Sequence, residues 1–213
     1  MYTVVLRVRP SGLDEYQYVS LVFAGLVPLI AFNEAIMSST SSLSSNRGLL
    51  MNTVFPADLI PVRAVVAALV PSGFAAIVAA VVGIVAGKGF APPLVLLPVL
   101  WLVFVGFMVG LAWIFSLISL VFRDAQQILA LALMILMIIS PAAYTPEMVP
   151  SGLDLLIYFN PLSYFILCFQ RIICYGQWPA LGVFSIAVAL ASISFFGGYW
   201  FFRKAKFAFF DYA

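Results

Sequence analysis

Five long apolar stretches, separated by short polar or proline-rich joints, limit this chain to few folds. A helix needs about 20 apolar residues to cross roughly 30 Å of hydrocarbon. Inside lipid only helices and closed barrels pair every backbone polar group, and these stretches lack the strict alternation of barrel strands. We therefore expect transmembrane helices over residues 18–37, 62–86, 93–122, 125–140 and 181–202.

Composition supports a membrane protein and excludes several function classes. The chain is 65% hydrophobic and 8% charged, against about 25% charged residues in a soluble domain. Its net charge of +2 is too small to indicate a nucleic-acid partner, and it contains no histidine. The prediction is one domain over residues 1–213, an all-α polytopic membrane protein.

Three reactive side chains have ordinary interpretations. Cys168 and Cys174 are six positions apart, so on one helix they face different directions. We expect them to be small buried side chains, with neither a disulfide nor a metal site. Glu34 lies late in the first expected span, where an interfacial position is the simplest interpretation and a functional intramembrane acid is the alternative.

Residues 141–179 differ from the five spans because prolines divide them. Asn160 is a good helix N-cap and Pro161 a good first helical residue. Two short helices are predicted, over residues 153–159 and 162–175, with Gly176 ending the second.

These two helices are each too short to cross the bilayer. A full crossing would place Gln170 and Arg171 at hydrocarbon depth, where an arginine costs from about 2.5 kcal/mol upward. A re-entrant hairpin entering from one side avoids most of that cost. We therefore expect about five transmembrane helices plus an outer re-entrant helical hairpin between the last two, with Gln170 and Arg171 facing water, a headgroup or another protein surface.

The charge distribution leaves the orientation open. With five spans and a cytoplasmic C-terminus, the joint over residues 38–61 and the tail over residues 203–213 lie inside the cell. With a sixth span at the start, both termini lie inside, and the count of positive residues slightly prefers that arrangement.

Several motifs, in order along nearly the whole chain, resemble the ABC-2 type transport permeases. They are LVFAGLVPLIAFNEAI, VFPADLIP, VFRDAQQIL, SPAAYTPEMVP, NPLSYFILCFQR and YGQWP. The resemblance is to the branch that exports polysaccharides such as O-antigen, capsule and teichoic acid. That family usually opens with an interface helix and a first span. Here MYTVVLRVRP looks like the exit from that span, which favours five spans and an outer hairpin.

The resemblance implies the permease subunit of an exporter in the bacterial cytoplasmic membrane. Its partners would be a second copy of itself, separate ABC ATPase subunits, membrane lipid and a glycan substrate. ATP and Mg would bind the ATPase, with no cofactor in this chain. The sequence agrees, because Gly87-Lys88 is followed by Gly89 and does not form a phosphate-binding loop.

The resemblance also implies two sets of site residues. Residues expected at the outer gate or along the substrate path are Tyr144, Asn160, Pro161, Tyr164, Gln170 and Arg171. Residues expected to couple to the ATPase are Arg47, Phe55, Pro56, Arg123 and Asp124. The basic residues that often flank the family's Phe-Pro pair are replaced here by Asn52, Thr53, Ala57 and Asp58.

Structural interpretations of both sets stay open. The tyrosines would anchor at the membrane interface, and Arg171 would pair with Glu147 or Asp154. The joint would be an ordinary interfacial loop. Asp124 would cap the following helix, and Arg123 would extend to lipid phosphate.

Two other functions compete with glycan export. One is an ABC-2 exporter of drugs or lipids. The other is a secondary transporter or channel, in which broken helices are common. Pro71 and Gly73, expected to interrupt the second span, support the latter weakly.

Overall fold

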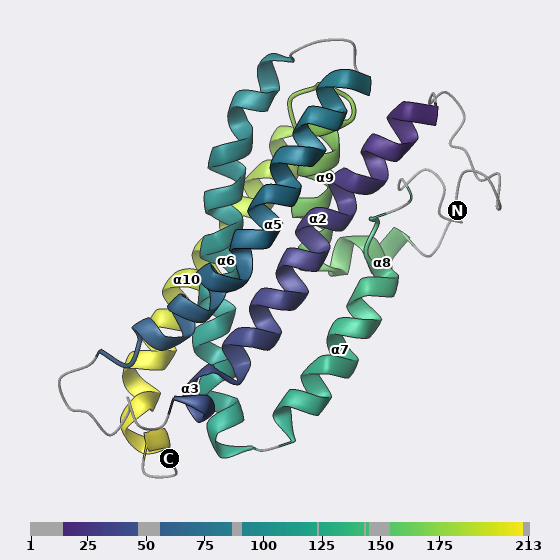
Figure 1. Cartoon of the computed structure of the whole chain (residues 1–213). Coiled ribbons are helices and arrows are strands. Elements are labelled where there is room, and N and C mark those ends of the chain that lie inside the picture. Colours follow the sequence, from purple (N-terminus) through teal and green to yellow (C-terminus); the bar gives the residue numbers. More distant parts are fainter. Residues whose placement is uncertain are drawn as a thin grey trace.

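The computed structural model describes residues 15–46, 56–86, 91–122, 124–142, 144 and 154–210. Every regular element in this part of the chain is helical, and Figure 1 shows the long helices side by side. The elements are α2 (Glu15–Thr40), α3 (Ser42–Ser45), α5 (Leu59–Ala86), η1 (Pro92–Leu96), α6 (Leu97–Val121), α7 (Ala125–Ile139), α8 (Asp154–Phe159), α9 (Pro161–Ile173) and α10 (Leu181–Phe210).

Among the described residues, four helical segments are long and apolar enough to cross a membrane. They are Tyr16–Thr40, Leu59–Val85, Pro92–Val121 and Leu181–Lys206. Each coincides within a few residues with one of the apolar stretches chosen from the sequence, because a chain in lipid must pair its backbone groups within the same segment. The prediction of an all-α polytopic membrane protein is confirmed.

The helix α7, which occupies the span expected over residues 125–140, is shorter than these four segments. Its 15 residues cover about 22 Å, less than the roughly 30 Å of hydrocarbon. It ends at Ser140, whose extended backbone precedes Pro141. Leu133 is its one fully buried residue, so α7 packs loosely alongside α2.

The expected break in the second span is wrong. The helix α5 continues without interruption from Leu59 to Ala86, through both Pro71 and Gly73. The helix is long and strongly apolar, and in lipid the backbone groups lost to a break would stay unpaired. The support that this break gave to a secondary transporter is therefore removed.

The helix α10 extends further than predicted. Residues 203–210 continue the helix, although a separate tail was expected from residue 203. Two cations near the end lie over aromatic rings of the same helix, Arg203 over Tyr199 at 5.7 Å and Lys204 over Trp200 at 4.4 Å. These contacts suit a position at the membrane interface, because amphipathic side chains gather at the membrane surface.

The helix α6 forms the centre of the packing. A Cβ on Gly110 would lie 2.2 Å from the backbone of Ser194 in α10, so the two helices touch backbone to backbone. On another face, Phe104 and Phe107 each lie 5.0 Å from the ring of Phe165 in α9. Tilted and stacked ring pairs at this separation add to the burial energy, and they hold α9 against the bundle.

The bundle has two ends, which we call the joint end and the hairpin end after the segments that lie there. At the joint end lie α3 and the ends of α2 and α6 (Figure 1). At the hairpin end, the Cys174 thiol donates to the Gln17 carbonyl at 3.3 Å, and Gly83 touches the Ile173 backbone. The start of α2, the end of α5 and the end of α9 therefore lie together.

Candidate functional site

The turn between α8 and α9 follows directly from its sequence. Asn160 has an extended backbone (φ −81°, ψ 111°), and its side-chain oxygen accepts from the Leu162 amide at 2.9 Å. Pro161 is the first helical residue, where its missing amide costs nothing. Past the C-terminal end, Gly176 takes a φ of +58° that other residues rarely adopt. The predicted pair of short helices and its cap are confirmed.

The segment that follows α7 is bound to α9 by two buried amides. The Asn160 Nδ2 group donates to Ser140 Oγ, and the Gln170 Nε2 group donates to the Pro141 carbonyl, each at 2.8 Å. These bonds pair groups that would otherwise be buried and unsatisfied. We call Gly25, Ser140, Pro141, Ala142, Asn160 and Gln170 the hairpin junction.

The helix α2 completes the hairpin junction. A Cβ on Gly25 would lie 2.3 Å from the Ala142 carbonyl oxygen, so any larger residue would push the segment away. The chain after α7 is thus enclosed between α2 and α9. Gly25 and Ser140 were not singled out from the sequence. Ser140 directly precedes Pro141 at the end of an apolar run, and this was the available signal.

Gln170 does not face water, a headgroup or another surface, and that prediction is wrong. Its side chain is 2% exposed, and Asn160 is 6% exposed. Successive helical residues point about 100° apart, so Gln170 and Arg171 take different sides of α9. The side chain of Arg171 is exposed.

Aromatic side chains surround the exposed side of the hairpin. The Tyr164 hydroxyl donates to the Tyr158 carbonyl at 3.0 Å, and the Tyr144 hydroxyl donates to the Ile139 carbonyl. Rings that the sequence did not single out are more exposed, with Phe159 at 82% and Trp178 at 61%. Glu147 and the Asp154 side chain, the suggested partners of Arg171, lie outside the described residues and side chains.

The helix α6 forms hydrogen bonds to residues on both sides of the joint. The Trp113 indole N–H donates to the Asp58 carbonyl at 2.9 Å, and the Ser119 hydroxyl donates to the Thr40 carbonyl. Thr40 ends α2 and Asp58 precedes α5, so residues from both sides of the joint meet on one helix. A partly polar hollow of about 320 Å³ lies beside them, lined by serines of α2 and α3, Asn46 and Arg63.

Comparison with known proteins identifies the family. The ABC-2 type transporter family model matches residues 1–174. This chain belongs to the ABC-2 type transporter family. It is a transport subunit and a multi-pass protein of the bacterial inner membrane.

Three relatives of this ABC-2 chain are each named O-antigen export system permease protein RfbA. The protein from Myxococcus xanthus is 27% identical over 216 positions, covering 98% of this chain and 80% of the relative. Two from Klebsiella pneumoniae are 26% and 27% identical over 179 positions. Each alignment with them covers 83% of this chain and 66% of the relative.

The coupling residues expected of an ABC-2 chain are only partly described. Arg47, Phe55 and Arg123 lie outside the described residues, while Pro56 and Asp124 are exposed. Asp124 occupies the N-cap position of α7, but its side chain makes no capping bond, so that structural interpretation is wrong. Its backbone is helical (φ −80°, ψ −9°), whereas a capping residue is normally extended, as Asn160 is.

The two cysteines of this ABC-2 chain match the prediction of small buried side chains. Cys168 and Cys174 are free and buried. The side chain of Glu34 is exposed, two turns before the end of α2 at the joint. In the described part of the chain, no three His, Cys, Asp or Glu side chains gather as a metal site would require.

Proposed function

We propose that this chain is the permease subunit of an ABC exporter that moves a polysaccharide or lipid-linked glycan across the cytoplasmic membrane. It works as one of two copies with separate ATPase subunits, which bind ATP and Mg²⁺. The observation that carries this proposal is the family match over residues 1–174. The substrate class is supported by the O-antigen export system permease of Myxococcus xanthus, which aligns over 98% of the chain.

The hairpin end suits the outer gate of such a path. The helices α8 and α9 are short, and α9 packs between the long helices, mainly against α2 and α10. Phe159 before α9 and Trp178 after it present exposed rings, and Arg171 near the end of α9 presents an exposed cation. Rings pack on the apolar faces of sugars, and a guanidinium pairs with carboxylate or phosphate groups.

The joint end suits the ATPase contact. Pro56 precedes α5, Asp124 precedes α7, and both are exposed. The hydrogen bonds of Trp113 and Ser119 connect the joint to α6. A movement of the joint would therefore displace α6, which packs directly on α9 and α10.

Nucleotide dependence tests the proposal. The chain, reconstituted in vesicles with the ATPase encoded beside it, should export a lipid-linked glycan only when ATP and Mg²⁺ are present. Transport by the chain alone without nucleotide would indicate a channel. ATP-dependent movement of drugs or phospholipids, with no glycan movement, would favour the other branch of ABC-2 exporters.

Replacement of Arg171 tests the gate. Arg171→Ala should lower glycan export while the ATPase still co-purifies, because the side chain is exposed and distant in sequence from the joint. Arg171→Lys keeps the charge and should restore part of the export. Loss of ATPase assembly in Arg171→Ala would instead assign the residue a structural role.

A further inference from the structure

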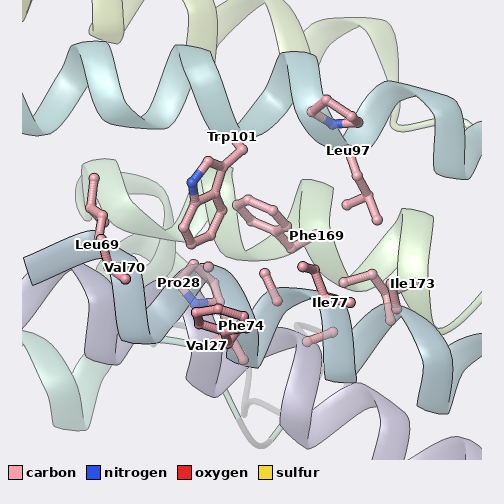
Figure 2. Close-up of a pocket in the computed structure, with 15 residues that line it drawn as sticks. Val27, Pro28, Leu69, Val70, Phe74, Ile77, Leu97, Trp101, Phe169 and Ile173 are labelled. Carbon is pink, nitrogen blue, oxygen red and sulfur yellow. The ribbon is translucent and has the colours of Figure 1, made fainter. Parts of the chain in front are cut away.

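A cavity that is closed on its inner side lies between four helices near the hairpin end. Its volume is about 450 Å³. Its walls come from α2, α5, α6 and α9, and Figure 2 shows Trp101, Phe74 and Phe169 turned toward the space between them. The helices that frame it include three spans, so it lies at the depth of the bilayer.

The lining of this cavity is apolar throughout. Every lining residue is alanine, glycine, proline, valine, leucine, isoleucine, phenylalanine or tryptophan, and the Trp101 indole N–H is the one side-chain group that can donate a hydrogen bond. A water molecule needs two to four polar partners to occupy such a site, and apolar cavities stay dry. A hydrocarbon occupant is therefore favoured over water, sugar or an ion.

The cavity opens toward lipid on one side. Val70, Phe74 and Ile77 of α5 are 56%, 68% and 63% exposed. At the back, Ala24 is fully buried and Phe169 is 2% exposed. Because α5 is long and apolar enough to cross the membrane, an exposed face of this helix is one that acyl chains can reach.

Small residues create the space. Gly73, Ala76 and Ala80 of α5 line the cavity, and a Cβ placed on Gly73 would meet nothing within 4 Å. An apolar cavity of about 150 Å³ holds one benzene, so by proportion this one holds roughly 18 carbon atoms. That is the size of one acyl chain of a membrane phospholipid, and a long isoprenoid chain would leave most of its length outside.

We propose that this cavity binds one acyl chain of a bilayer phospholipid. The chain enters between α5 and α6 and rests against Phe169 and Ile173 of α9. It supports α9 from a different side than the hairpin junction, in which Gln170 takes part. The bilayer would in this way stabilise the position of the hairpin. This inference is independent of the exported substrate.

Photolabelling tests the proposal directly. The full chain is placed in nanodiscs of phosphatidylethanolamine and phosphatidylglycerol, with a small fraction of phosphatidylethanolamine carrying a diazirine in its acyl chain. Label should map to residues 69–80, 97–101 and 169–173 above the level on the remaining lipid-facing helices. Gly73→Leu fills the cavity and should lower this label about tenfold, because added atoms displace the ligand from a packed site.

Controls separate occupancy from misfolding. Gly197→Leu is a matched change, because Gly197 is exposed on α10 and a Cβ there also meets nothing within 4 Å. It should leave the label unchanged. Leucine also favours a helix over glycine, so Gly73→Leu should fold, and Ala76→Phe gives a second filled cavity.

Three results would overturn the proposal. The first is equal labelling of the cavity residues in the wild-type protein and both filled variants. The second is wild-type label spread evenly over all lipid-facing helices. The third is labelling of the cavity by a photoreactive polyprenyl phosphate but not by the phospholipid. That last result would assign the cavity to a carrier-lipid tail and leave the export proposal intact.

Discussion

At the scale of single residues, Gln170 and Arg171 are adjacent polar side chains with different roles, one buried and one exposed. Gln170 donates to the Pro141 carbonyl at 2.8 Å from a buried position. Gln170→Leu removes that donor and leaves the carbonyl unpaired, which should lower the free energy of unfolding by about 1–3 kcal/mol. Thermal unfolding of the purified protein in detergent measures this change.

The neighbouring arginine supplies the control for that prediction. Arg171 is exposed, so Arg171→Ala should change stability by at most about 0.5 kcal/mol. A melting temperature that stays unchanged in Gln170→Leu, or falls equally in both variants, would contradict the role assigned to the hairpin junction.

At the scale of elements, α6 connects the joint to the rest of the bundle. The double variant Trp113→Phe, Ser119→Ala removes the donors to the Asp58 and Thr40 carbonyls. Phenylalanine keeps much of the ring packing against Phe195 and Tyr199. Amide hydrogen exchange should therefore rise at the end of α2, in α3 and at the start of α5, because local opening costs less.

A hydroxyl elsewhere provides the comparison for this element-scale test. Ser192 is exposed and donates only within its own helix, to the Val188 carbonyl at 2.8 Å. Ser192→Ala should leave exchange at the joint unchanged. If the double variant also left it unchanged, α6 would not restrain the joint.

At the scale of the whole molecule, the two ends of the bundle should lie on opposite sides of the membrane. The helix α10 has 30 residues and is about 45 Å long, more than the roughly 30 Å of hydrocarbon. A cysteine at Gln177, just before α10, should react with a membrane-impermeant maleimide added outside intact cells. A cysteine at Ser45 should react only after the membrane is permeabilised.

The native cysteines should contribute little background to this labelling test. Cys168 and Cys174 are both buried, so background reaction should be low. Reaction of the Gln177→Cys variant only in permeabilised cells would reverse the orientation, and would place the hairpin on the cytoplasmic side.

The positions of the helices were readable from the sequence, because each depends on local chemistry. Long apolar runs must become helices in lipid, and α2, α5, α6 and α10 follow those runs. Asn160 followed by Pro161 and Gly176 marked the limits of α9 within a few residues. Pro71 led to the wrong prediction of a break in α5, because a proline inside a strongly apolar span does not by itself end the helix.

By itself the sequence determined the class of the protein, its helices and the turn that starts α9, since these follow from hydrophobic length and backbone preference. Only the tertiary structure decided that Gln170 is buried and Arg171 exposed, that Gly25 meets Ala142, and that Gly73 opens a cavity. Each of these facts depends on contacts between helices far apart in the chain. Apolar periodicity gives no signal for such contacts when most faces of a helix are apolar.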